Sequence, residues 1–185
     1  DPDVSFTEVD AVRLGLQMLS ALHALHVQQV IHRDVKPANV VDTPEGPKLI
    51  DLGAAAVVSV RDNDVGQSLM TQGTVTDLVG THGYMAPEVY REPDQVGPCS
   101  DIFALAATLY FLLSRQMPFY AAHELGWVLA VAGNMEEQAP RLVDVCPVVS
   151  SGLSDIIAKG LHKKISERYT SAMAMKEDLE QLMQS

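Results

Sequence analysis

Apolar and polar residues recur with the period of an α-helix near the start of the chain. Within residues 7–26, apolar side chains occur every three or four positions, at Val9, Val12, Leu16, Leu19, Leu22 and Leu25. This period predicts an amphipathic helix with one apolar face. Thr7 can cap its first turn, because Asp10 follows three residues later and can complete a reciprocal pair of hydrogen bonds.

Four further helices are predicted in the second half of the chain. Residues 100–114 are apolar on nearly every side, which predicts a helix that is buried all round. Its most apolar part, residues 103–113, is shorter than the ~20 residues that a membrane-spanning helix needs, so no membrane span is predicted. Shorter helical patterns cover residues 122–132, 151–161 and 171–183.

One small β-hairpin is predicted between the first helix and the apolar helix. Residues 40–41 and 48–50 are short strand-like pieces, and the Pro and Gly residues between them, within 43–47, are typical of a turn. Residues 59–83 are rich in polar side chains and Gly and are predicted to form a long loop, a feature that is commonly functional. The whole pattern predicts one mainly α domain spanning residues 1–185.

Composition and charge narrow the classes of function. The 185 residues are 47% hydrophobic and 20% charged, as is typical of a soluble globular domain. There are 24 acidic and 13 basic side chains, and the net charge is −11. Nucleic acids and anionic membranes are bound through clustered Lys and Arg, so neither partner is predicted. The two cysteines, Cys99 and Cys146, make no disulfide framework, which favours a reducing compartment and a cytoplasmic location.

Three short motifs carry the candidate chemistry. They are residues 32–39 (HRDVKPAN), residues 51–53 (DLG) and residues 80–88 (GTHGYMAPE). In this order and spacing they resemble the serine/threonine branch of the eukaryotic-type protein kinase superfamily. The resemblance runs from about residue 5 to residue 182. It implies the fold of the C-terminal lobe, a helical bundle whose small β-hairpin carries the catalytic and metal-binding loops.

The resemblance implies roles for five residues. Phosphoryl transfer needs a hydroxyl held in line with the γ-phosphate, and cations that offset the charge on the transferring group. By their places in the motifs, Asp34 would orient and deprotonate the hydroxyl, and Lys36 would steady the γ-phosphate. Asn39 and Asp51 would hold Mg²⁺ through oxygen ligands. Val41 would pack under adenine, although core packing alone also explains it. ATP and Mg²⁺ are therefore the implied cofactors, and a protein is the implied substrate.

The resemblance also implies supporting residues. Asp101 is similar to a buried aspartate that holds the backbone of the catalytic loop, and the alternative is a helix cap. Glu88 and Arg168 are similar to an ion pair that links the end of the activation segment to the last helices, and the alternative for Arg168 is a solvated charge. Thr81 is similar to a threonine that bonds near the catalytic Asp and Lys. Phe103 departs from the tryptophan that is usual at its position.

Residues 51–88 correspond to the activation segment of such a kinase. Arg33, beside the candidate catalytic Asp, implies control by a phosphate in this segment through charge-assisted hydrogen bonds. Our hypothesis is that Asp77 partly substitutes for that phosphate. The rival is phosphorylation of Thr74 or Thr76 by an upstream kinase, and a solvated loop acid is the third reading of Asp77.

The motifs begin early in the chain, at residue 32. Neither a Gly-rich phosphate loop nor a Val-Ala-x-Lys strand occurs in the sequence, so we expect that the N-lobe is absent from this chain. An uncovered C-lobe would expose apolar side chains at Val41, Leu49 and Leu52. The predicted function is transfer of the ATP γ-phosphate to a protein Ser or Thr as the C-lobe of a complete kinase domain. The alternative is a catalytically silent scaffold or interaction module in a larger assembly. A small-molecule kinase is disfavoured, because residues 80–88 shape a protein-substrate groove in the family.

Overall fold

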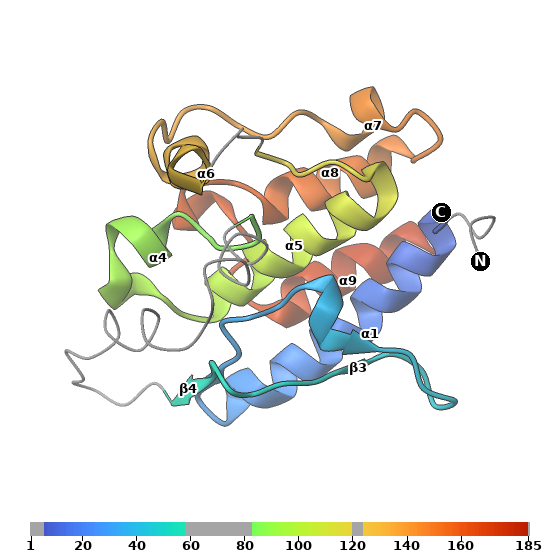
Figure 1. The fold of residues 1–185 in the computed structure, drawn as a ribbon. Coiled ribbons are helices and arrows are strands. Elements are labelled where there is room, and N and C mark those ends of the chain that lie inside the picture. The colour runs from blue at the N-terminus through green and yellow to red at the C-terminus, as the bar shows by residue number, and fades with distance from the viewer. Residues whose placement is uncertain (1–5, 58–82, 120–123, 185) are drawn as a thin grey trace.

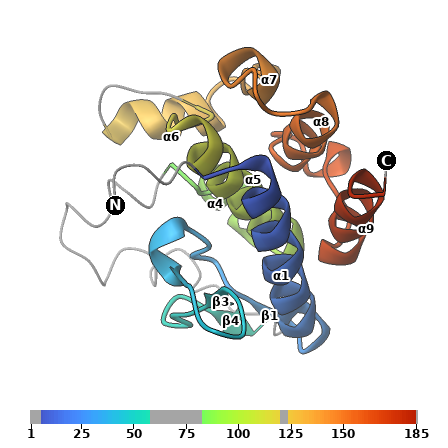
Figure 2. The same cartoon turned by 90° about the vertical axis from the view of Figure 1, so that its right-hand side faces the viewer.

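The computed structural model describes residues 6–57, 83–119 and 124–184, and Figure 1 shows a bundle of helices with short strands beside it. The bundle is built around α5, against which α1, α8 and α9 pack (Figure 2). The α-helices are α1 (Glu8–Val27), α4 (Glu88–Arg91), α5 (Pro98–Ser114), α6 (Glu124–Ala132), α7 (Leu142–Val145), α8 (Ser151–Gly160) and α9 (Ala172–Leu182). Short 3-10 helices span Pro37–Asn39, Pro93–Gln95 and Ile165–Glu167. The described part of the chain is therefore mainly helical, as the sequence predicts.

Helix α1 begins where the capping pattern places it. The hydroxyl of Thr7 accepts a hydrogen bond from the backbone N–H of Asp10 at 3.2 Å, and the N–H of Thr7 donates to the Asp10 carboxylate at 3.0 Å. Helix α1 packs against α5 and α9, and three residues of its predicted apolar face, Val12, Leu19 and Leu22, are buried. Leu16 and Leu25 are half-buried, and Val9, in the first turn, is 64% exposed.

Helix α5 is the buried centre of the molecule. Every residue from Ser100 to Tyr110 is buried, so the prediction of a helix surrounded on all sides is confirmed. The helix begins two residues earlier than predicted, at Pro98, a residue whose fixed φ suits the first turn. The buried hydroxyl of Thr108 donates to the carbonyl of Ala104 at 2.8 Å, so this polar group is paired within the core.

The predicted hairpin is present, and the structure adds a second strand pair. Strands β2 (Val40–Val41) and β3 (Lys48–Leu49) pair antiparallel, with a turn at Gly46 in a positive-φ conformation that favours glycine. Strands β1 (Val30–Ile31) and β4 (Ala56–Val57) form the additional antiparallel pair. The sequence did not predict it, because two-residue strands show no periodicity.

The C-terminal helices lie close to their predicted positions. Helix α8 is capped by Ser150, whose hydroxyl accepts from the N–H of Leu153 at 3.1 Å. Helix α9 is capped by Ser171, whose hydroxyl accepts from the N–H of Ala174 at 3.1 Å. No helix in residues 6–57, 83–119 and 124–184 has both the length and the apolar character needed to span a membrane.

Candidate active site

A buried carboxylate at the start of α5 holds the backbone of residues 32–39. Asp101 is 1% exposed and accepts the backbone N–H of His32 at 2.9 Å and that of Arg33 at 2.8 Å. It also lies 2.8 Å from Nε2 of His26, at the end of α1. Gly97, and not Asp101, occupies the N-cap position of α5. The structure therefore places Asp101 as an anchor of this loop rather than as a helix cap.

Arg33, whose backbone N–H donates to Asp101, adopts a strained backbone conformation. Its φ is 67°, in the left-handed region that costs free energy for a residue other than glycine. The two hydrogen bonds that Asp101 makes to this stretch offset that cost. Burial lowers the pKa of the Arg33 guanidinium, and the negative charge of Asp101 opposes this shift. Nε of Arg33 is buried and has no hydrogen-bond partner among the described residues.

Asp34 projects from this strained backbone with its two carboxylate oxygens in different surroundings. Oδ2 lies 2.8 Å from Nζ of Lys36 and accepts a hydrogen bond from Nδ2 of Asn39 at 2.8 Å. Nδ2 of Asn39 also donates to the backbone carbonyl of Asp34 at 2.7 Å. Oδ1 is buried and has no hydrogen-bond partner within the described ranges. One oxygen is thus fixed by two neighbours, while the other is left to accept a proton or a hydrogen bond.

The β2–β3 hairpin brings Asn39 and Asp51 to the same end of one small sheet. The N–H of Ile50 donates to the carbonyl of Asn39 at 2.8 Å, and Asp51 follows directly. Asp51 is exposed, has a φ of 67°, and accepts the N–H of Gly53 at 2.9 Å. The amide nitrogen of Asn39 is committed to Asp34, which leaves its amide oxygen as the group suited to a metal ion.

The donor set fits Mg²⁺ held partly by a nucleotide. Over residues 6–57, 83–119 and 124–184, no group of three or more His, Cys, Asp or Glu side chains could hold a metal ion. Asn39 and Asp51 offer one amide oxygen and one carboxylate. That set matches a cation that keeps several waters and takes its remaining ligands from substrate phosphates.

Apolar side chains are exposed beside Asp51. Val41 is 43% exposed, Ile50 is 43% exposed and Leu52 is 56% exposed, whereas Leu49 is half-buried. The exposure predicted for Val41 and Leu52 is therefore found, and that predicted for Leu49 is partial. The exposed side chains therefore lie on the β2–β3 hairpin or directly after it.

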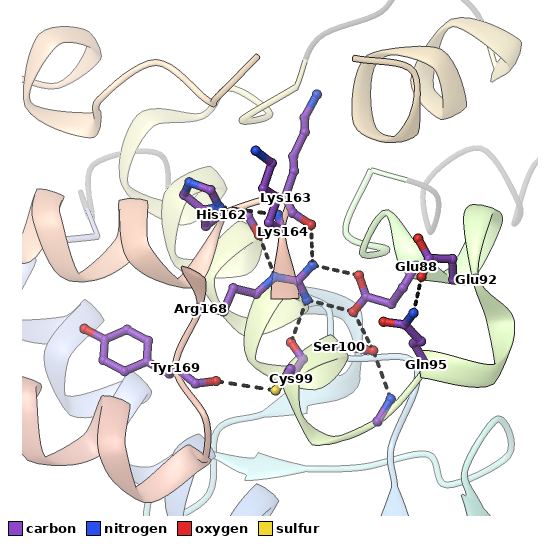
Figure 3. A network of polar contacts seen from close by, with 11 residues as sticks. Glu88, Glu92, Gln95, Cys99, Ser100, His162, Lys163, Lys164, Arg168 and Tyr169 are labelled. Carbon is purple, nitrogen blue, oxygen red and sulfur yellow. Dashed lines mark hydrogen bonds and ion pairs between the residues drawn. The ribbon is translucent and has the colours of Figure 1, made fainter. Parts of the chain in front are cut away.

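A second buried polar network surrounds Glu88, the last residue of the third motif (Figure 3). The guanidinium of Arg168 donates to both carboxylate oxygens of Glu88, each at 2.7 Å, and both residues are buried. The Ser100 hydroxyl donates to Glu88 at 2.7 Å. The remaining Arg168 donors reach the backbone carbonyls of His162 at 2.5 Å, Lys163 at 2.9 Å and Cys99 at 3.1 Å. Bidentate pairing and full hydrogen bonding are what make a buried charge pair tolerable.

Three residues of these networks were not singled out from the sequence. His26 reaches Asp101 across 75 positions of the chain. Ser100 bonds Glu88, and Lys163 supplies a carbonyl to Arg168. No local pattern marks a histidine at a helix end, a serine in a first turn or a lysine in a basic pair as a network member, so spacing alone could not have found them.

Four predicted regulatory residues lie outside the described residues. They are Thr74, Thr76, Asp77 and Thr81, within residues 58–82.

The motif geometry agrees with comparisons to known proteins. The model of the family described as the protein kinase domain matches residues 2–179. The chain belongs to the protein kinase domain family. Among its curated relatives, this kinase chain is 34% identical to serine/threonine-protein kinase PknH of Mycobacterium tuberculosis over 163 residues, 88% of the chain and 24% of the relative.

Two further relatives of the kinase chain carry similar names. It is 32% identical to the probable serine/threonine-protein kinase PknB of Corynebacterium glutamicum over 185 residues, 97% of the chain and 27% of the relative. It is 34% identical to the probable serine/threonine-protein kinase PkwA of Thermomonospora curvata over 131 residues, 71% of the chain and 16% of the relative. The kinase chain spans less than a third of the length of each of these three relatives.

Proposed function

We propose that this chain is the C-lobe of a protein kinase that transfers the γ-phosphate of ATP to the hydroxyl of a protein Ser or Thr. The observation that supports the proposal is the hydrogen bonding of the two carboxylate oxygens of Asp34. One of its oxygens is fixed by Lys36 and Asn39, and the other is buried without a partner among the described residues. A carboxylate held in this way can accept the proton of a hydroxyl that reaches its second oxygen.

The residues around Asp34 have separate roles in binding the metal, the phosphate and the adenine. When Mg²⁺ and ATP are bound, the metal offsets the charge on the transferring phosphoryl group. Asn39 and Asp51 would hold the metal, and Lys36 would place a positive charge near the γ-phosphate. Because Lys36 already pairs with Asp34, the same lysine ties the position of the phosphate to that of the hydroxyl. Val41, exposed on the hairpin, would pack against adenine.

The exposed apolar edge of the hairpin supports a place for a second lobe. Val41, Ile50 and Leu52 are exposed on the hairpin or directly after it, where a complete kinase domain would carry its N-lobe. In this proposal the N-lobe binds the α- and β-phosphates of ATP from the side opposite the C-lobe.

The activation segment would set the activity through Arg33. The buried Nε of Arg33, which has no partner among the described residues, supports a role in binding an anion. That anion would be the Asp77 carboxylate or the phosphate of Thr74 or Thr76, which an upstream kinase would add.

The proposal is tested by phosphate transfer from labelled ATP in the full-length protein. With Mg²⁺ and a generic protein acceptor, we expect label on Ser or Thr of the acceptor and none after chelation of the metal. Calorimetric titration with Mg-ATP provides the second readout. Binding weaker than about 1 mM, ~−4 kcal/mol, together with no transfer, would favour the catalytically silent scaffold instead.

A further inference from the structure

A lysine outside the candidate active site is almost completely buried. Lys163 is 1% exposed, and its ammonium group donates to the backbone carbonyls of Ala130 at 2.5 Å and Asn134 at 2.9 Å. These carbonyls lie in the last turn of α6 and just beyond it. The final carbonyls of a helix lack partners within the helix and carry partial negative charge, so a cation stabilises them. Burial lowers the pKa of Lys163, and the charge of Glu137 opposes the shift.

A second cation reaches the same end of α6 from another direction. Nη1 of Arg91, the last residue of α4, donates to the carbonyl of Ala132 at 2.6 Å. Helix α4 begins at Glu88, which is the partner of Arg168. The C-terminal end of α6 is therefore held by one cation from α4 and by another from the segment that precedes Arg168.

Stacked rings join Lys163 to the buried Glu88–Arg168 pair. The ring of Phe103 stacks on that of Phe119, with centroids 6.1 Å apart and an angle of 7° between the planes. The guanidinium of Arg168 lies 5.0 Å from the Phe103 ring, and the ammonium of Lys163 lies 4.6 Å from the Phe119 ring. A cation near an aromatic ring face is stabilised, more strongly when both are desolvated.

These contacts form a closed circuit through α4, α6 and the segment 163–168. Glu88 bonds Arg168, and Arg168 bonds the carbonyl of Lys163 (Figure 3). Lys163 holds the end of α6, α6 accepts from Arg91, and Arg91 lies on the same helix as Glu88. In a closed circuit, displacement of one member strains every other contact.

We propose that Lys163 is a positioning residue that locks α6 to α4, so that both helices and the end of the activation segment form one rigid unit. The kinetic part rests on the proposed function and on the family resemblance, which implies that residues 80–88 shape the groove for a protein substrate. Loosening of α6 would then shift this groove and weaken binding of the protein acceptor, without touching the groups that handle ATP.

The structural part is tested by hydrogen exchange of the full-length protein carrying Lys163→Met. Met keeps most of the volume of the lysine but removes the charge and the donors. The amides of Gly133, bonded to the carbonyl of Leu129, and of Glu92, bonded to that of Glu88, report on α6 and α4. We expect both to exchange about tenfold faster, because the carbonyls of Ala130 and Asn134 lose a buried donor.

The neighbouring lysine supplies the matched control. Lys164 lies beside Lys163 but pairs with the exposed carboxylate of Glu136 at 2.6 Å, so Lys164→Met is expected to leave both amides at the wild-type rate. Acceleration at Gly133 with an unchanged Glu92 would show that α6 and α4 are not locked together and would overturn the proposal. So would unchanged rates at both amides.

A milder variant covers the case in which Lys163→Met does not fold. Arg91→Met removes the exposed cation of the circuit and is expected to accelerate the same two amides. If Arg91→Met accelerates neither amide, the proposal fails.

Kinetics of the same variants test the positioning role. We expect Lys163→Met to raise KM for the protein acceptor about fivefold or more, with kcat and KM for ATP within about twofold of wild type. A fall in kcat with an unchanged acceptor KM would contradict positioning of the groove. If the wild-type protein transfers no phosphate, the proposed function fails, but the exchange experiment still decides whether the helices are locked.

Discussion

The charged groups in two regions of this chain differ in their burial and in their hydrogen bonding. In the buried region, Asp101 and the Glu88–Arg168 pair lie inside the helical bundle and have their oxygens and N–H groups paired. At the hairpin edge, Asp51 is exposed, and the bond to its oxygen that the structure shows comes from the N–H of Gly53, two residues away. Asp34 lies between the two regions, with one oxygen held by Asn39 and the other buried without a partner among the described residues.

This difference distinguishes residues that fix the position of the backbone from residues that would contact the reactants. Buried charges with complete hydrogen bonding fix the backbone, because moving them would leave a charge unpaired in a low-dielectric interior. A group that binds a metal or accepts a proton has to keep an unfilled coordination position. We therefore expect stability to depend on the first region and chemistry on the second.

The largest effect on stability is expected from Arg168→Met. This change leaves the buried carboxylate of Glu88 without its ion-pair partner and should lower the free energy of unfolding by about 3–5 kcal/mol. Chemical denaturation measures the loss. The matched control is Arg141→Met, which breaks the exposed pair with Asp155 and should cost no more than about 1 kcal/mol. Equal losses in the two variants would remove the distinction between buried and exposed pairs.

A smaller loss is expected from Asp101→Asn. The amide keeps one acceptor oxygen but turns an NH₂ group toward donors, so at least one bond to His32, Arg33 or His26 is lost. We expect a decrease of about 2–3 kcal/mol in the free energy of unfolding, which is typical of hydrogen bonds to a charged group. Faster hydrogen exchange at the amides of His32 and Arg33 should accompany it. Wild-type exchange at these two amides would argue against the anchor.

The same change from Asp to Asn at the exposed Asp51 is expected to reduce phosphate transfer while leaving stability nearly unchanged. Asp51→Asn should alter the free energy of unfolding by less than about 0.5 kcal/mol, because Asp51 is exposed and an amide oxygen can still accept from Gly53. Transfer of phosphate by the full-length protein should fall about a hundredfold or more, since a charged metal ligand is lost. A destabilised variant with wild-type transfer would show that Asp51 has a structural role only.

The smallest effect is expected from Tyr84, which packs edge-on against Phe111 with ring centroids 6.2 Å apart. Burial raises the pKa of Tyr84 from 10.0 to about 12. Between these values the folded protein keeps the phenol proton and the unfolded chain releases it, so stability falls as the pH rises. Tyr84→Phe should make this alkaline decline shallower in denaturation measured at several pH values. An identical pH dependence in the variant would exclude Tyr84 as a contributor.

Local pattern was sufficient for the parts of the fold that depend on near neighbours. The apolar character of α5, the capping pair of Thr7 and Asp10 and the turn of the β2–β3 hairpin are all properties of a few adjacent residues. The motifs likewise placed Asp34, Lys36 and Asn39 together, because they lie within six positions of one another.

Long-range partners needed the structure. The strand pair of β1 and β4 joins two-residue pieces that carry no periodic signal. The contact of His26 with Asp101 depends on where α1 ends relative to α5, which no local pattern specifies. Lys163 is a similar case, since a lysine in a charged pair is normally solvated, and only the position of α6 makes this one buried.

In the proposed mechanism, Asp34 accepts the proton of a protein hydroxyl during transfer from ATP. The most direct measurement compares phosphate transfer by the full-length protein with that of Asp34→Asn, at equal protein concentration and saturating Mg-ATP. We predict a loss of about 10²–10⁴-fold in the rate, because general-base catalysis contributes an amount of that size, with unchanged affinity for Mg-ATP. A rate within about threefold of wild type would contradict the role of Asp34 and, with it, the proposed mechanism.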